Sequence, residues 1–320
     1  MNQPLEVLEG MFVNGLWEGP ENTFLGGLAR TEWVIPRYML TFSHDAPRVV
    51  NLTSLTMLGD LSTENALHLG ITVEPGVSVI LIERHAFETP KAERSGRGPS
   101  VTRIVDLDIT LLPGSRLTHG VVIGASPRGR HLAATRVRVT EGALYDRSVF
   151  LGGGKVVRDD LEVTLEGPRA EARVRGLARL TGAEHAEARA HVVHAVPRGT
   201  SRQLYKYVLD DQAQGAFHGK ITVKSGAVKS DGQQVGKALV LSDRAQMDAQ
   251  PELIIHADDV VCSHGMAIGD VSADEVFYLR SRGIPESEAR GLLVRGFLAE
   301  VLDAIPSPEV RAAFEEEMAR

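Results

Sequence analysis

The sequence predicts a mainly β protein, a solenoid of stacked β-coils that ends in a small helical unit. Turn signals built from proline and glycine precede extended apolar runs, at residues 74–77, 112–115 and 140–143. Up to residue 269 the apolar residues follow a period of two, and beyond it a period of 3.6. Strands punctuated by tight turns, with no helical segment between them, are typical of stacked β-coils.

The segment 171–191 tests this interpretation, because it is rich in Ala, Arg and Glu, which favour helix by intrinsic propensity. Ala186, Ala188 and Ala190 nevertheless alternate strictly with polar residues, and residues 172–179 show the same alternation, interrupted at Gly176 and Leu177. An alternating pattern gives a single apolar face only in an extended chain. We therefore predict two strands in this segment.

The C-terminal residues predict short helices. Ser272 and Glu275 have the spacing of a capping box, and Pro308 fits the first turn of a helix. One helical stripe contains Ala289, Leu293, Phe297, Val301 and Ala304. The predicted organisation is a β-helix core over residues 1–271 and a C-terminal helical domain over residues 272–320.

Composition excludes several classes of protein. The net charge of −7 over 320 residues argues against a nucleic-acid-binding protein, which needs a basic face. No secretory signal and no run of about 18 apolar residues is visible, and a single cysteine excludes an internal disulfide. These features predict a cytoplasmic protein without a membrane segment. The glycine-rich segment 152–155 lacks the spacing of a phosphate loop, so it predicts a β-turn.

Cys262 and His264 are the candidate ligands for a metal. Residues two apart on a strand leave the same face, about 6–7 Å apart. Thiolate and imidazole suit iron, zinc or a cluster, but two ligands do not complete a site that normally needs four. Without further information, a lone cysteine is as well explained as a small buried apolar residue.

Several motifs resemble the SufB/SufD family of iron–sulfur cluster assembly proteins, and its SufD branch in particular. Residues 257–265 (ADDVVCSHG) and 277–284 (FYLRSRGI) resemble the C-terminal signature of SufD. Four upstream segments resemble the family in the same order: 194–206 (HAVPRGTSRQLYK), 217–221 (FHGKI), 239–245 (LVLSDRA) and 250–253 (QPEL). Members usually carry a further helical domain before the β body, whereas this chain starts almost at the β body, so that domain is expected to be absent or trimmed.

The resemblance implies a right-handed parallel β-helix with a small C-terminal α-helical domain. It further implies a non-catalytic SufD-like subunit that pairs with a SufB-like scaffold through the β-helix and binds a SufC-like ATPase through its C-terminal helices. The family's Cys-x-His pair carries over to Cys262 and His264, as transient ligands of iron or a nascent iron–sulfur cluster at the subunit interface. No cofactor is expected to be held stably.

The helical end contains aromatic and arginine residues of the kind that interfaces favour. We expect the ATPase partner to contact Phe277, Tyr278, Arg280, Arg282 and Phe297. The alternative is that Phe277 and Phe297 belong to the apolar core.

Three other functions fit parts of the sequence. A hydrolase with Cys262 as nucleophile would need direct contact with a base, which His264 two residues away does not provide without distortion. A β-helix polysaccharide lyase would need clustered acidic metal ligands that the sequence lacks. A structural β-helix homodimer or scaffold without a cluster role remains the main alternative, and a homodimer would bring two Cys262–His264 pairs across its two-fold axis.

Overall fold

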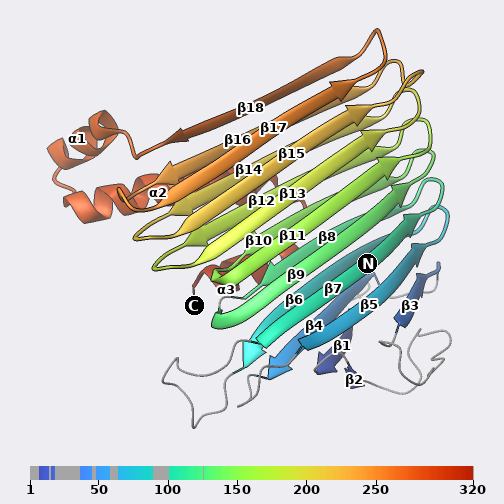
Figure 1. The fold of residues 1–320 in the computed structure, drawn as a ribbon, viewed down its shortest axis with the longest axis horizontal. Coiled ribbons are helices and arrows are strands. Elements are labelled where there is room, and N and C mark those ends of the chain that lie inside the picture. The colour runs from blue at the N-terminus through green and yellow to red at the C-terminus, as the bar shows by residue number, and fades with distance from the viewer. Residues whose placement is uncertain are drawn as a thin grey trace, which may run out of the picture.

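The computed structural model describes residues 7–13, 16–18, 37–44, 48–57, 64–88, 101–124 and 126–319. In these residues the chain winds through two stacked sheets, whose strands are parallel except where residues 16–18 pair antiparallel with residues 7–13. From residue 16 onward, successive strands alternate between the two sheets (Figure 1). Three helices follow the last strand. The predicted β-solenoid with C-terminal helices is confirmed.

The described strands form two sheets, named sheet A and sheet B. Sheet A has ten strands: β1 (Val7–Val13), β2 (Leu16–Glu18), β4 (Val49–Met57), β6 (Ser78–Glu88), β8 (Arg116–Ile123), β10 (Leu144–Leu151), β12 (Glu171–Leu180), β14 (Thr200–Leu209), β16 (Asp231–Val240) and β18 (Val261–Gly269). Sheet B has eight: β3 (Arg37–Phe42), β5 (Glu64–Val73), β7 (Val101–Leu111), β9 (Ser126–Val139), β11 (Gly154–Leu165), β13 (His185–His194), β15 (Gln214–Val223) and β17 (Gln246–Ile255).

The turns stack on one another as the strands do. Gly76, Gly114 and Gly142 all have positive φ, a conformation that glycine adopts at little steric cost. The Gly76 N–H donates to Pro113 O at 3.0 Å, and the Gly114 N–H donates to Glu141 O at 2.9 Å. Each turn therefore fixes the position of the next, which aligns residues of successive coils.

The alanine-rich segment forms strands β12 and β13, as its period of two predicts. Ala186, Ala188 and Ala190 are buried between the two sheets, while Glu187 and Arg189 face outward and pair with each other. Tertiary burial thus overrides the helical propensity of the composition.

The interior is apolar along most of its length but encloses an ion pair. The guanidinium of Arg147 on β10 donates two hydrogen bonds to the Asp159 carboxylate on β11, at 2.8 and 2.7 Å. Both side chains are 1% exposed. Burial alone would lower the pKa of Arg147, but the Asp159 charge holds that pKa above its ordinary value. The pair links the two sheets across the interior.

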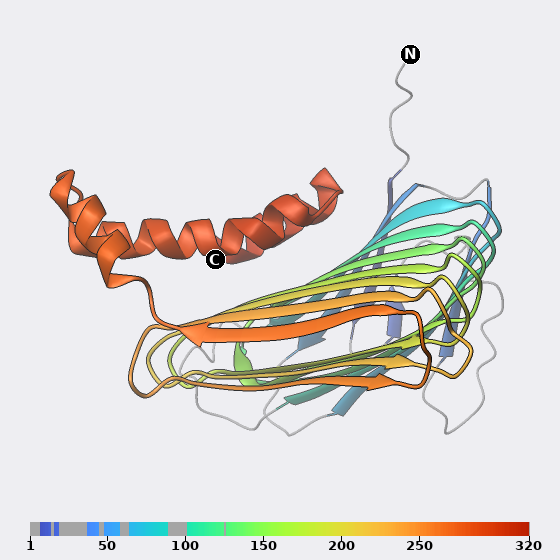
Figure 2. The ribbon, with the colours of Figure 1, turned by 90° about the horizontal axis from the view of Figure 1, so that it is seen from above.

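The helices are α1 (Ala273–Ser281), α2 (Glu286–Ala304) and α3 (Pro308–Met318). The Ser272 side chain accepts from the Glu275 N–H and thereby caps α1, as its spacing predicts. Helices α2 and α3 lie along the outer face of sheet A (Figure 2). Their buried contacts with the sheet involve Ile82, Val122, Phe150, Leu177, Val208, Leu298, Val301, Ile305, Val310, Ala313 and Phe314.

The buried face of α2 is rotated from the predicted stripe. Ala289 and Val301 are buried, but Ala304 is exposed and Leu298 takes a core position instead. Packing against the curved outer face of sheet A selects this face, a tertiary effect that helical periodicity does not contain. None of the described helices α1, α2 and α3 combines the length and apolar character that a bilayer span requires.

Replacing Asp159 by Asn removes the partner of a buried guanidinium and leaves its charge uncompensated. We expect Asp159→Asn to lower the free energy of unfolding by about 3–5 kcal/mol, measured by urea denaturation. The control is Asp160→Asn next to it, because Asp160 faces outward and its ion pair with Arg158 is about a third exposed. That variant should cost about 1 kcal/mol or less, and equal losses in both would contradict the structural role of the buried pair.

Candidate functional site

Cys262 and His264 lie on β18, the last strand of sheet A. The parallel register pairs Cys262 with Gly232 and His264 with Gln234 on β16. Gly232 and Gln234 are buried in the solenoid, so their partners occupy the inward-facing positions of the final coil. Cys262 is partly buried and His264 is exposed, because β18 is the last strand of its sheet and no further coil of the described chain covers them. The structure confirms that both side chains belong to one face of one strand.

The thiol of Cys262 has an apolar neighbourhood. Cys262 packs against a small cluster that includes Ile221, Val223 and Ala227. Burial raises the pKa of the Cys262 thiol, and a backbone hydrogen bond at Gly232 offsets part of that rise. A thiol of this kind is protonated at neutral pH and becomes a strong ligand only when a metal displaces its proton.

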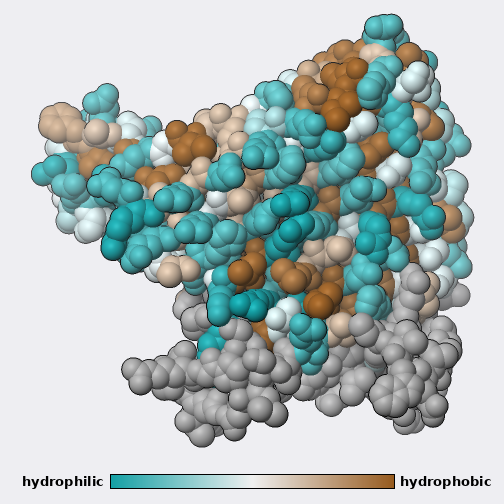
Figure 3. All heavy atoms as spheres, viewed as in Figure 1, coloured by the Kyte–Doolittle hydropathy of each residue, from teal (hydrophilic) through white to brown (hydrophobic). Residues whose placement is uncertain are grey.

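The end of the solenoid leaves two strand edges open. β18 ends sheet A and β17 ends sheet B, and neither has a neighbour on its outer side in the described part of the chain. Apolar side chains stand exposed at this end: Val261 is 65% exposed, Ile268 51% and Ile255 42% (Figure 3). Unpaired edges with apolar side chains are sites at which another β chain adds.

Two buried glutamines lie behind His264, at the paired positions of the two preceding strands of sheet A. Gln203 on β14 pairs with Gln234, which pairs with His264. Neither amide atom of Gln203 or Gln234 has a hydrogen-bond partner among the described residues. The Gln234 amide fits because Gly219 faces it from sheet B, where a Cβ atom would stand 2.3 Å from Nε2. The sequence analysis did not predict these glutamines as part of the site, although the period of two assigns both to the inward face.

Two further sets of buried polar side chains were not predicted from the sequence. His194 lies 2.8 Å (Nε2) from the Ser201 hydroxyl, and burial lowers the pKa of His194 to about 4. At the other end of the interior, Glu83 contacts His119 at 3.2 Å and His85 at 3.3 Å. These contacts pair only some of the polar atoms: His85 Nδ1, for example, has no hydrogen-bond partner among the described residues. Neither pattern produces a recognisable sequence motif.

The donors of Cys262 and His264 do not complete a metal site by themselves. Within the described ranges, no group of three or more His, Cys, Asp or Glu side chains is arranged to hold a metal ion. His256 lies in the loop between β17 and β18 and its backbone N–H bonds to Val223 O. The described residues around the pair therefore complete no metal site.

The expected partner-binding residues divide into two groups. Phe277 and Tyr278 on α1 are 72% and 58% exposed, and the Arg282 guanidinium lies 5.3 Å from the Tyr278 ring centre. Arg280 on the same helix forms an exposed ion pair with Glu286. These residues make one exposed aromatic and basic surface, which we call the α1 surface.

Phe297 does not belong to the α1 surface. It lies on α2, where the Lys206 Nζ donates to its carbonyl oxygen at 2.5 Å and stands 4.2 Å from its ring centre. The same ammonium group contacts Glu300 Oε2 at 2.5 Å. Lys206 is almost fully buried, so this contact anchors α2 to β14. Phe297 thus connects the helix to the sheet.

Comparison with known proteins places these features in a family. The family model for the SufBD core domain of the SUF iron–sulfur cluster assembly system matches residues 58–297. An iron–sulfur cluster assembly SufBD family protein of Synechocystis is 33% identical over 258 residues, which cover 80% of this chain and 57% of the relative. The iron–sulfur cluster assembly protein SufD of Escherichia coli is 33% identical over 197 residues, 62% of this chain and 47% of the relative.

A third relative, an iron–sulfur cluster assembly SufBD family protein of Mycobacterium tuberculosis, is 32% identical over 264 residues, 78% of this chain and 63% of the relative. The chain spans roughly half to two thirds of the length of these relatives. The family model covers the strands from β5 to β18 and most of α2. The chain belongs to the SufB/SufD family of iron–sulfur cluster assembly proteins.

Proposed function

We propose that this protein is a SufD-like subunit whose final coil stacks against the final coil of a SufB-like partner. Cys262 and His264 contribute two ligands to iron or a nascent iron–sulfur cluster between the two chains, and the partner contributes the others. A SufC-like ATPase binds the helical end and supplies ATP hydrolysis, so the subunit itself is not catalytic.

The observation that carries this proposal is the position of the two donors at the open end of the solenoid. Cys262 and His264 share the inward face of β18, next to strand edges that have no neighbour among the described residues. A chain that docks on these edges extends both sheets and covers the two donors. Burial of Val261 and Ile268 in the same contact contributes about 25 cal/mol for each Å² of apolar surface removed from water.

The helical end supports the ATPase contact. The α1 surface exposes aromatic and arginine side chains, the residue types that dominate binding energy at interfaces. Helix α2 connects that surface to β14 through Lys206. A force applied to the helices therefore reaches sheet A, which also carries β18.

Loss of either donor should impair cluster assembly. In a complex reconstituted with SufB-like and SufC-like partners, Cys262→Ala and His264→Ala are each expected to lower cluster yield by at least about tenfold, since even lost outer-shell partners of a metal cost about 10–100-fold in affinity. The measurement is the visible absorbance of the cluster together with bound iron. Ser263→Ala is the matched control, because Ser263 lies between the two donors and faces the other side of β18.

Assembly of each variant complex is checked by size-exclusion chromatography. Normal cluster yield in an intact complex with Cys262→Ala would show that the cysteine is structural. If the purified chain instead forms a stable homodimer that excludes the SufB-like partner, the heteromeric interface is wrong.

The α1 surface gives a separate prediction for ATPase binding. The double change Phe277→Ser and Tyr278→Ser should weaken SufC binding by about 2 kcal/mol or more, roughly 30-fold, as loss of interface hot spots does. Calorimetric titration of the partner measures the effect. Leu292→Ser on α2 serves as the control, because Leu292 is 38% exposed and lies outside the α1 surface. Unchanged affinity in the double variant would remove α1 from the ATPase interface.

A further inference from the structure

A second concave site lies on the outer face of sheet A, beside α2. It is a cleft of about 300 Å³, and three arginines line it: Arg173, Arg175 and Arg202. Leu204 and Val235 supply apolar lining, and Glu300 of α2 borders the cleft. The site is separate from Cys262 and His264, which occupy inward positions on another strand.

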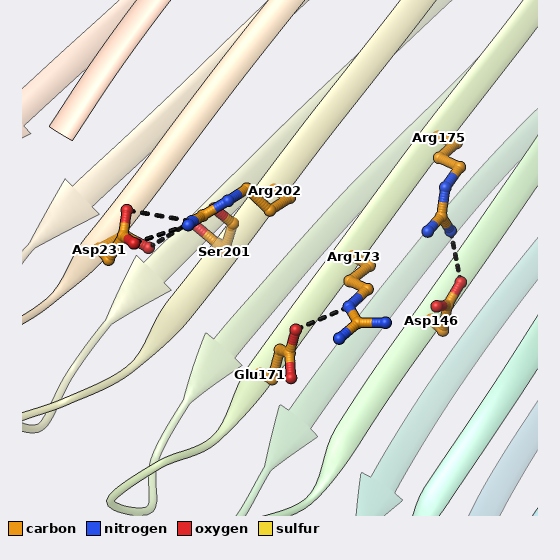
Figure 4. A network of polar contacts seen from close by, with 7 residues as sticks. All are labelled: Asp146, Glu171, Arg173, Arg175, Ser201, Arg202 and Asp231. Atoms are coloured by element: carbon orange, nitrogen blue, oxygen red, sulfur yellow. Dashed lines mark hydrogen bonds and ion pairs between the residues drawn. The ribbon is translucent and has the colours of Figure 1, made fainter. Parts of the chain in front are cut away.

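The strand register brings the arginines together. Arg173 on β12 is the direct partner of Arg202 on β14. Arg175 follows two residues after Arg173, so it leaves the same outward face of β12. Figure 4 shows the three guanidinium groups on this face, each directed toward a different carboxylate. Three cationic groups from two neighbouring strands thus share one surface.

The guanidinium groups retain unused donors. Each carries five N–H groups. Arg173 donates from Nε to Glu171 at 2.6 Å, and Arg175 donates from Nη1 to Asp146 at 2.5 Å. Within the described residues, both terminal nitrogens of Arg173 and the Nη2 of Arg175 contact no acceptor. Arg202, in contrast, is engaged at both terminal nitrogens by the Asp231 carboxylate.

The carboxylate that borders the cleft is already neutralised. Glu300 contacts the Lys206 ammonium at 2.5 Å and the Lys237 ammonium at 3.2 Å. These contacts lower the pKa of Glu300, so it is ionised and held in its ion pairs. It therefore does not compete for the spare donors of Arg173 and Arg175. Each of the three arginines is itself ion-paired, so what the cleft offers to an anion is the spare N–H donors of Arg173 and Arg175.

We propose that this cleft binds a small polyanion that carries two or more carboxylate or phosphate groups. The planar guanidinium fork of Arg173 matches either group in a bidentate arrangement. Arg175 reaches a second anionic group from the same strand, and Leu204 and Val235 accommodate the carbon skeleton. The volume, at the low end of ligand sites, suits a small metabolite.

The test is calorimetric titration of the full chain with two probes, tricarballylate for the carboxylate class and pyrophosphate for the phosphate class. We expect saturable 1:1 binding of at least one probe, and the comparison identifies the preferred class. Arg173→Gln should weaken binding by at least about tenfold, because it removes charge-assisted hydrogen bonds. Arg173→Lys keeps the charge but loses the planar guanidinium fork. Its affinity for the probe should therefore lie between those of the unchanged chain and of Arg173→Gln.

Arg158→Gln is the matched control. Arg158 is an outward-facing arginine of sheet B, comparably exposed, and its Nε also donates to a carboxylate, that of Asp160. The Arg158→Gln variant should bind the probe with the affinity of the unchanged chain. The urea midpoint of every variant should match that of the unchanged chain. Absence of saturable binding for both probes, or equal binding by Arg173→Gln, overturns the proposal. If neither probe binds and Arg173→Gln instead weakens association with a protein partner, the cleft is a protein contact.

Discussion

The parallel register between coils is the constraint on which the other features depend. From β3 onward, each strand bonds only to the strands one coil before and one coil after it, and the stacked glycine turns hold this alignment from coil to coil. Inward positions therefore form columns through the whole body. A side chain acquires its neighbours from residues about one coil away in sequence, so its chemical environment is decided by the column it occupies.

The columns explain how the interior tolerates polar groups. Arg147 reaches across to Asp159 on the opposite sheet, and each charge compensates the other. Gln203 and Gln234 lie in a column without such a partner, and a buried polar group left unpaired costs about 1–3 kcal/mol. Unpaired amide atoms thus lie directly behind His264, at the end where a coil has only one neighbour.

Local periodicity was sufficient to predict a β body followed by helices, and the cap of α1 at Ser272. Alternation identified β12 and β13 despite their helical composition, and the spacing of Cys262 and His264 correctly put both on one face. The glutamine column, the arginine cleft and the anchoring contact of Phe297 were not predicted. Each depends on which residue lies one coil away or under a helix, and loops of unequal length prevent that register from being counted along the sequence.

The position of the Cys-x-His pair follows from the same geometry. In an inner coil, inward side chains are enclosed by the coils on both sides and contact only their own chain. In the final coil, the register still orients Cys262 and His264 rigidly through Gly232 and Gln234, yet their outer side is open. In the described part of the chain, inward side chains are therefore accessible to a second chain only at an end of the body. Because a partly buried thiol favours its protonated form, the same placement makes Cys262 a weak nucleophile, and the proposed cluster role would require a metal that displaces its proton.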